Sequence, residues 1–327
     1  MRVAVTGAAG FLGANVVNAL LEEGHEVVAI DRVASDLVSD PTVSWVSADV
    51  LDPAQMRAAL EGVEVVYHLV AVISLKQEDP LAWRVNVDGV ATVARAALEV
   101  GVRRMVNCGS LNAFHYRLGD RVDESSPRSL PESSAPVYNR SKYAGELELL
   151  KVVEDGLDAL TCNPTGIYGP VDQPTRLSRL NGSLRDAARG RAPVAVNGAF
   201  DMVDVRDVAR GFVLAAEKGR TGENYLLTGH RIGLNAVTAM TAVAAGQRPP
   251  LFNLPLGLIG TIAPIVDPVA RLFGSDSMTA MAMETLTASP VVDGSKARRE
   301  LGYEPRPTEE TVRDLVDFFR EHGLIGR

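Results

Sequence analysis

Tyr138 and Lys142 are the residues of this chain whose types and spacing most directly indicate chemistry. They stand four positions apart, so on a helix they project from the same face. A neighbouring ammonium favours the phenolate form of a tyrosine, whose ordinary pKa is about 10, and makes the phenol more useful as a general acid or base at neutral pH. By itself this spacing is typical of a surface pair. Its place after the fifth predicted strand, which ends near Ser110, favours catalysis on a hydroxyl or carbonyl group.

The glycines near the start of the chain form a second candidate site. Gly7, Gly10 and Gly13 lie between a short apolar run and a helical pattern. These glycines would allow a tight turn, a close approach of backbone N–H groups to a pyrophosphate, and close packing of helix on strand. The helix N-terminus adds a partial positive charge. Asp31 follows Gly13 by eighteen residues, at the end of the second predicted strand, where a carboxylate can bind an adenosine ribose. The pattern predicts dinucleotide binding.

The elements that must position these residues are visible in the apolar pattern. Short apolar runs alternate with longer helical patterns, and the runs read as continuous Val, Ile and Ala rather than as alternating apolar and polar residues. Such strands are buried on both faces, as in a parallel sheet covered by helices. We therefore predict an α/β fold with a doubly wound parallel sheet, a Rossmann fold. Strands are expected at 3–5, 27–30, 43–46, 63–67, 105–108 and 157–162, and helices at 12–23, 53–60, 80–99 and 136–154.

The division into domains follows from a change in this rhythm. After about residue 163 the chain contains more segments interrupted by glycine and proline. We expect a dinucleotide-binding domain over residues 1–163 and a smaller, mainly substrate-binding C-terminal lobe over residues 164–327. Residues 194–228 have strand and helix patterns that could return to the Rossmann sheet, so the two lobes are expected to be interleaved in sequence.

Composition and charge exclude several classes of function. The 327 residues carry a net charge of −8, which argues against a nucleic-acid partner. Cys108 and Cys162 each lie inside an apolar run, so buried free thiols are expected rather than a disulfide framework. The five histidines lack ligand spacing, and no metal site is predicted. The first residues lack the pattern of a signal peptide, and we expect a cytoplasmic protein.

Several short motifs follow one another along the chain. They are "TGAAGFLG" at 6–13, Asp49 and Val50, "HLVA" at 68–71, "NVDG" at 86–89, "YNRSK" at 138–142, "NPTGIYGP" at 163–170, "VDVRDVARG" at 203–211 and "LGYEPRPTEETVRDLVDFF" near the C-terminus. In this order they resemble the extended short-chain dehydrogenase/reductases over nearly the whole chain. The resemblance is closest to the branch that contains dihydroflavonol reductases, 3β-hydroxysteroid dehydrogenases and related NAD-dependent epimerase/dehydratases.

The resemblance implies a role for each catalytic candidate. Ser110 would hold the reacting oxygen, with Asn112 as the alternative, while Tyr138 exchanges the proton. Lys142 would bind ribose hydroxyls and tune Tyr138. Asn86 would hold a backbone or water position near the Lys142 ammonium, or else serve helix packing.

The cofactor implied is NAD, with NADP as the alternative. Asp31 would repel the 2′-phosphate of NADP, whereas Arg32 could hold that phosphate. His68 is interpreted as a satisfied histidine at a sheet end rather than as a catalyst. The cofactor contacts that the resemblance implies are Gly7, Gly10, Phe11, Leu12, Gly13, Asp31, Arg32, Asp49, Val50, Leu69, Val70, Ala71, Asn86, Tyr138, Lys142, Pro164 and Ile167.

Three features bear on the substrate. Phe114 and His115 stand where the family usually has Tyr and Gly, and Phe200 stands where sugar-nucleotide members tend to carry a diphosphate-binding Arg. Residues 249–266 hold no charge but contain four prolines and two glycines, so a continuous membrane span is not expected. A short apolar helix over the cleft is predicted there, with a core or dimer-interface element as the alternative.

These observations favour an NAD(P)-dependent oxidoreductase that interconverts a secondary alcohol and a ketone by hydride transfer. The expected substrate is an apolar small molecule of steroid, flavonoid, terpenoid or aryl type, and the expected assembly is a homodimer. One alternative is a sugar-nucleotide epimerase or dehydratase, which retains its reduced cofactor. The other is a non-catalytic dinucleotide sensor, against which the presence of Ser110, Tyr138 and Lys142 argues.

Overall fold

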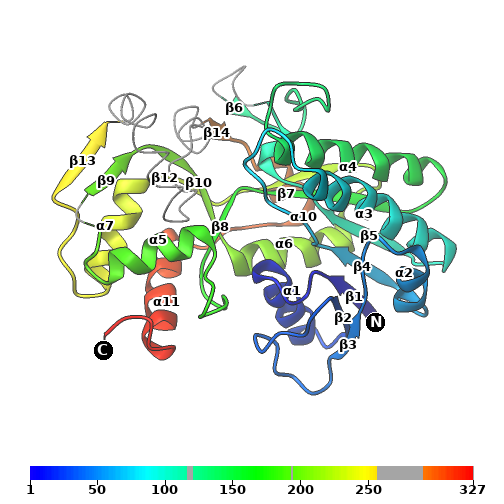
Figure 1. Ribbon diagram of the computed structural model, residues 1–327, viewed down its shortest axis with the longest axis horizontal. Coiled ribbons are helices and arrows are strands. Elements are labelled where there is room, and N and C mark those ends of the chain that lie inside the picture. The colour runs from blue at the N-terminus through cyan, green and yellow to red at the C-terminus, as the bar shows by residue number, and fades with distance from the viewer. Residues whose placement is uncertain (116–120, 193, 256–289, 327) are drawn as a thin grey trace.

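A seven-stranded parallel sheet forms the centre of the larger part of the molecule (Figure 1). The computed structural model describes residues 1–115, 121–192, 194–255 and 290–326. The strand order is β11-β7-β5-β4-β1-β2-β3, so the chain changes direction across the sheet between β1 and β4, which pair in parallel. Ligands of doubly wound folds bind at the carboxyl ends of the strands at this point. The strands are β1 (Arg2–Thr6), β2 (Glu26–Asp31), β3 (Ser44–Ser47), β4 (Val65–His68), β5 (Arg104–Cys108), β7 (Ala159–Pro164) and β11 (Asn224–Leu227).

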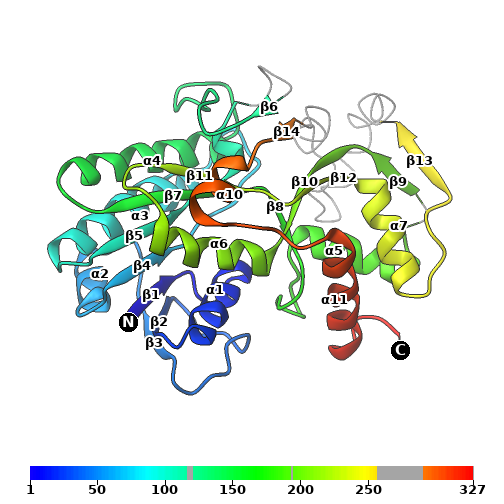
Figure 2. The same cartoon turned by 180° about the vertical axis from the view of Figure 1, so that it is seen from behind.

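Helices cover both faces of this sheet, as Figures 1 and 2 show from opposite sides. Successive side chains of a strand point to opposite faces. Val3 and Val5 therefore pack with α1 (Phe11–Glu22) and α6 (Val205–Lys218). Ala4 packs in a second cluster with three helices, which are α2 (Pro53–Leu60), α3 (Pro80–Glu99) and α4 (Val137–Glu154). Because both faces of the sheet are buried, the interiors of the central strands are mostly apolar.

A smaller lobe lies at the end of the molecule away from the N-terminus, and the C-terminus lies there as well (Figure 1). Its core joins Tyr168, Met202, Val237, Leu315 and Phe319. The lobe contains a three-stranded sheet of β8 (Gly166–Tyr168), β10 (Ala199–Asp204) and β12 (His230–Gly233). It also contains a two-stranded sheet of β9 (Val194–Asn197) and β13 (Phe252–Pro255). Its helices are α5 (Arg179–Ala188), α7 (Leu234–Ala244) and α11 (Thr308–Glu321).

Four further short elements lie along the side of the large sheet that carries β11. Strand β6 (Arg121–Val122) pairs in parallel with β14 (Val291–Val292). Helix α10 (Ser295–Leu301) contacts α6 and β11, as the view in Figure 2 shows. A short 3-10 turn, η1 (Leu111–Ala113), follows β5. Segments from the last third of the chain therefore support the large sheet.

The predicted doubly wound fold is confirmed, with one local correction. Within residues 194–228, β9 and β10 pair in the small sheets, and the chain returns to the large sheet through α6 and β11. Phe252–Pro255 form strand β13 rather than the predicted apolar helix, since Pro249 and Pro250 favour extended backbone just before it. Residues 256–266 of that prediction lie outside the described residues. In the described part of the chain, no helix is long and apolar enough to cross a bilayer.

Candidate active site

The glycine turn between β1 and α1 depends on two missing side chains. Gly7 has φ +76°, in the left-handed region that favours glycine, and its N–H donates to the Ile30 carbonyl at 2.8 Å. Gly10 donates to the Gly7 carbonyl at 3.0 Å, which closes the turn. A Cβ on Gly13 would lie 2.0 Å from that same carbonyl oxygen. The turn can therefore be this tight only with glycine at position 13.

A pocket of about 290 Å³ opens beside this turn at the carboxyl ends of the strands. Nine of the predicted cofactor residues line it, and these are Gly7, Gly10, Asp31, Arg32, Asp49, Val50, Leu69, Val70 and Ala71. Sequence reasoning missed six more, which are Ile30, Ala48, Leu51, Val72, Leu81 and Val85. Five of the six adjoin predicted positions: four lie at or near strand ends, and Val85 precedes Asn86 on α3. Leu81, also on α3, has no such neighbour.

Asp31 is held rigidly at the edge of this pocket. Its Oδ2 accepts a hydrogen bond from the Ala9 N–H at 3.1 Å, and its Oδ1 accepts one from the Arg32 N–H at 2.7 Å. The carboxylate thus links the glycine turn to the end of β2. A turn without Cβ atoms, a helix N-terminus and a fixed carboxylate fit the pyrophosphate and ribose of a dinucleotide.

Other predicted cofactor residues lie outside the lining of this pocket. Phe11, Leu12 and Gly13 form the first turn of α1, and Leu12 packs against the core. Pro164 pairs with Leu227 at the end of β7, and Ile167 packs on the core from β8. These positions support the turn and the sheet rather than the wall of the pocket.

Asn86 ties a loop to a helix. Its Oδ1 accepts from the Val72 N–H at 2.8 Å, and its Nδ2 donates to the Val72 carbonyl and the Ser141 hydroxyl, each at 3.0 Å. Asn86 therefore holds a backbone position, that of Val72, and contacts the residue before Lys142; its place near the Lys142 ammonium stays a prediction. These bonds fix the loop that follows β4, whose residue Val72 lines the pocket.

Ser110, Tyr138 and Lys142 are brought together in a buried site. Each is less than one-tenth exposed. Tyr138 and Lys142 lie in the first two turns of α4, and Ser110 begins the turn η1 after β5. The Ser110 hydroxyl hydrogen bonds with Tyr138 and accepts the Asn112 N–H at 3.1 Å. Lys142 Nζ donates to the Cys108 carbonyl at 2.7 Å.

Burial makes Tyr138 hold its proton more tightly. It raises the pKa of Tyr138 to about 12, although the hydrogen bond to Ser110 opposes the shift. Burial also lowers the pKa of Lys142. The prediction that the pKa of Tyr138 moves toward neutral pH is therefore wrong for this structure, because the loss of solvation outweighs the hydrogen bond to Ser110. Tyr138 keeps its proton at neutral pH and can donate it.

His68 lies at the end of β4 and is 1% exposed. Its Nδ1 is 2.7 Å from the Thr6 hydroxyl, whereas no hydrogen-bond partner among the described residues reaches its Nε2. Burial, and next the charge of Lys142, lower the pKa of His68 to about 3. The imidazole is therefore neutral. We expected both ring nitrogens to have hydrogen-bond partners, and among the described residues only Nδ1 has one.

Two unusual aromatic positions take part in packing. Phe114 is buried, with the Arg128 guanidinium 3.8 Å from its ring centroid. The ring of Phe200 covers Gly166, where a Cβ would lie 2.5 Å from it. Phe200 is partly buried against the core of the small lobe, so an apolar ring occupies the position of the expected arginine.

Comparison with known proteins decides the family. Residues 3–228 match the NAD dependent epimerase/dehydratase family. The chain belongs to this family. It is an NAD-dependent enzyme, and the predicted resemblance is confirmed.

Two curated relatives and one solved structure are similar over nearly their whole length. Sterol demethylase protein B of Methylococcus capsulatus is 35% identical over 99% of this chain and 100% of that protein. The 3-beta-hydroxysteroid dehydrogenase of Mycolicibacterium neoaurum is 28% identical over 98% and 92% of the two chains. The crystal structure of gox2253 superposes with a TM-score of 0.85 at 31% identity and covers 99% of both chains.

Proposed function

We propose that this enzyme interconverts a secondary alcohol and a ketone on an apolar small molecule by hydride transfer with NAD. The observation that supports this most directly is a protonated Tyr138, buried and hydrogen-bonded to Ser110. A buried acid that keeps its proton at neutral pH is suited to protonating a carbonyl oxygen as hydride arrives.

The proposed roles follow from the positions of the side chains. When bound, NADH would supply the hydride for reduction of a ketone, and NAD would accept the hydride in oxidation of an alcohol, at C4 of the nicotinamide. In the direction of reduction, Tyr138 donates its proton to the carbonyl oxygen, and the Ser110 hydroxyl holds the same oxygen by a hydrogen bond. Lys142, which already donates to Cys108, binds ribose hydroxyls with its remaining N–H groups. In the oxidation of an alcohol, Tyr138 must first lose its proton, and Lys142 is the positive charge that would stabilise the phenolate.

The lining of the pocket suggests how this chain holds NAD. The pyrophosphate would lie at the glycine turn of Gly7 and Gly10, and the adenosine ribose at Asp31. Asp49 and Val50 would contact the adenine. Phe11, Leu12 and Gly13 support the turn, and Pro164 and Ile167 support the sheet.

An apolar substrate is favoured by Phe200 and by the two relatives, which are named for sterol and hydroxysteroid chemistry. Binding a diphosphate would need a cation at position 200. An aromatic ring there instead favours an apolar substrate, because burying apolar surface contributes roughly 25 cal/mol per Å². The same reasoning makes a nucleotide sugar a poorer substrate. The further alternative, a sensor without catalysis, would have no use for a buried Ser110, Tyr138 and Lys142.

A panel of substrates tests this proposal. Purified enzyme would be assayed in both directions, with NAD and NADP, on steroid, flavonoid, terpenoid and aryl alcohols and ketones. A matched set of UDP- and dTDP-sugars would be assayed alongside. We expect turnover with the apolar compounds. Turnover confined to the sugar nucleotides would overturn the proposal in favour of an epimerase or dehydratase.

We propose further that residues 1–163 bind NAD and that residues 164–327, apart from the part of 194–228 that joins the large sheet, bind the substrate. We also propose a homodimer in the cytoplasm. The buried or half-buried free thiols of Cys108 and Cys162 suit a reducing compartment. Light scattering after gel filtration would test the dimer, and cell fractionation would test the location.

A further inference from the structure

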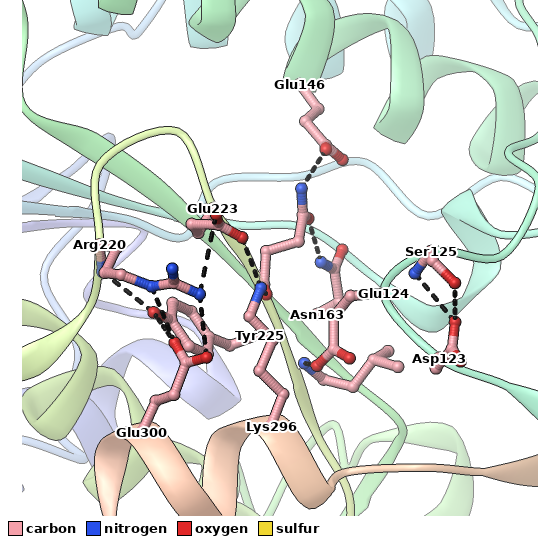
Figure 3. A network of polar contacts seen from close by, with 12 residues as sticks. Asp123, Glu124, Ser125, Glu146, Asn163, Arg220, Glu223, Tyr225, Lys296 and Glu300 are labelled. Carbon is pink, nitrogen blue, oxygen red and sulfur yellow. Dashed lines mark hydrogen bonds and ion pairs between the residues drawn. The ribbon is translucent and has the colours of Figure 1, made fainter.

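A chain of three buried or half-buried side chains leads from α4 to the backbone of Ser110. Figure 3 shows the part of this chain between Glu146 and Asn163. Glu146 Oε1 accepts from Asn224 Nδ2 at 2.5 Å, and Asn224 Oδ1 accepts from Asn163 Nδ2 at 2.6 Å. Asn163 Oδ1 then accepts the N–H of Ser110 at 2.9 Å. The three side chains come from α4, β11 and β7; β7 follows α4 directly, whereas Asn224 of β11 lies 61 residues after Asn163.

This chain of hydrogen bonds has a direction. A carboxylate can only accept, so Glu146 fixes the amino group of Asn224 toward itself and the carbonyl oxygen of Asn224 toward Asn163. The same constraint passes to Asn163, whose oxygen must then face Ser110. The charge of Glu146 thereby determines that an acceptor, and not a donor, meets the Ser110 N–H.

Both ends of this chain of hydrogen bonds are fixed by further contacts. Glu146 is 3% exposed and is paired with Arg128 at 2.7 Å, which balances the buried charge. Asn224 is fixed through its backbone, because Lys296 Nζ donates to its carbonyl at 2.7 Å. At the other end Gly109 leaves room for Asn163, since a Cβ on Gly109 would lie 2.0 Å from Asn163 Oδ1.

The position of the Ser110 backbone matters because its hydroxyl bonds with Tyr138. An error of about 1 Å in the placement of a reacting group can cost about 100-fold in rate. Burying two asparagines and a glutamate has a cost that apolar residues of similar volume would avoid. If this chain of hydrogen bonds positions Ser110, that role explains why these polar side chains are present despite the cost of burying them.

We propose that Glu146, Asn224 and Asn163 are positioning residues that fix Ser110 for its contact with the reacting oxygen. This inference rests on the proposed function. It adds the part of the molecule that sets the geometry of Ser110 and Tyr138, which we call the acid pair. None of the three needs to touch the substrate or NAD.

The direction of the chain allows a sharp test with Asn163→Asp. The new carboxylate still accepts from Ser110, but Asn224 must then donate to it and turn its own oxygen toward Glu146, where two acceptors meet. We expect kcat to fall by about tenfold to 100-fold. The KM and the Kd for NAD should stay within about twofold, because uniform binding is unchanged.

Adding Glu146→Gln to Asn163→Asp removes the conflict, because the amide introduced at position 146 can donate to Asn224. The double variant should recover at least about fivefold of the lost kcat, while Glu146→Gln alone lowers kcat or leaves it unchanged. Glu148→Gln is the matched control on the same helix, since Glu148 pairs with Lys151 at the surface, and it should leave kcat unchanged. A double variant no better than Asn163→Asp would overturn the inference.

A second measurement needs no substrate. In Asn163→Ala the amide proton of Ser110 loses its acceptor, and its NMR resonance should move upfield, whereas Glu148→Gln should leave it in place. An unmoved resonance contradicts the inference even if the aspartate variant does not fold.

Tyr138→Phe assayed in parallel separates the proposed function from the positioning role. If that variant keeps normal turnover, the proposed function fails. If it loses turnover while Asn163→Asp keeps it, the positioning role alone fails.

Discussion

The proposed NAD pocket and the buried acid pair, Ser110 and Tyr138, are constructed in different ways. Much of the pocket wall comes from strand ends and from glycines in one short turn, so its shape depends on backbone and on absent side chains. The placement of Ser110 instead depends on side chains from α4, β7 and β11 that meet through hydrogen bonds. Local sequence determines the first region. Tertiary packing determines the second, and each region therefore responds to its own kind of substitution.

Tyr138→Phe should have the largest effect on the acid pair. It removes the proton donor but keeps the ring, so we expect turnover to fall about 100-fold or more. The NAD pocket does not include Tyr138, and the Kd for NAD should stay nearly unchanged. Steady-state kinetics and cofactor titration would measure both. Near-normal turnover would end the proposed mechanism.

Gly13→Ala should damage the pocket in the complementary way. The added Cβ would lie 2.0 Å from the Gly7 carbonyl oxygen, so the turn must open. We expect the free energy of unfolding to fall by about 1–3 kcal/mol and the affinity for NAD to drop. The matched control is Gly182→Ala in α5, where an added Cβ meets nothing within 4 Å. Denaturant unfolding and cofactor titration of both variants provide the comparison, and equal effects would show that the turn is not tight.

Asp31 offers a finer test of the pocket. Two like charges about 4 Å apart near a protein surface repel by on the order of 4 kcal/mol before relaxation and screening. We therefore expect NAD to bind more tightly than NADP. Asp31→Ser should shift this preference toward NADP by about tenfold or more, a change of about 1.4 kcal/mol. Asp36→Ser, on the following loop, is the control. A wild-type Kd for NADP below that for NAD would contradict the assignment.

His68 connects the two regions, and its effect should appear only below neutral pH. It precedes Leu69 of the pocket, and the charge of Lys142 contributes to its lowered pKa. The unfolded chain binds a proton at a pH of about 6.5, whereas folded His68 binds one only at a pH of about 3. Above that unfolded pKa, His68 is neutral in both states and its burial costs no stability through titration. As the pH falls from about 6.5 toward about 3, protonation of the unfolded chain lowers the free energy of unfolding by up to about 1.4 kcal/mol per pH unit.

His68→Asn keeps a partner for Thr6 but cannot titrate. Its free energy of unfolding should decline less steeply than that of the wild type between about pH 6 and pH 4, by about 1 kcal/mol per pH unit. Chemical denaturation across this range would measure the difference, with His25→Asn as the matched control. Parallel declines in the wild type and in His68→Asn would mean that His68 is not buried in its neutral form.

Sequence alone predicted the sheet and the pocket because both depend on local patterns. The run at 3–5 became β1, the pattern at 80–99 became α3 to the residue, and Gly7 and Asp31 line one pocket. The run at 252–255 was misread because pairing with β9, a tertiary contact, makes it a strand.

The site was only partly predictable, for a similar reason. The spacing of Tyr138 and Lys142 placed them on one helix, but the raised pKa of Tyr138 comes from burial by the whole fold. Asn163 and Asn224 lie 61 residues apart, and their contact follows from the pairing of β7 with β11. No local spacing in the sequence indicates such a contact.

The most direct test of the central claim is the stoichiometry of NADH release. Wild-type enzyme would be mixed with excess NAD and an alcohol that the substrate panel identifies, and free NADH and ketone would be counted over many turnovers. The account predicts one NADH in solution for each ketone formed, with both lost in Tyr138→Phe. Conversion of substrate without accumulation of free NADH would contradict it and would indicate an enzyme that keeps its reduced cofactor, as an epimerase does.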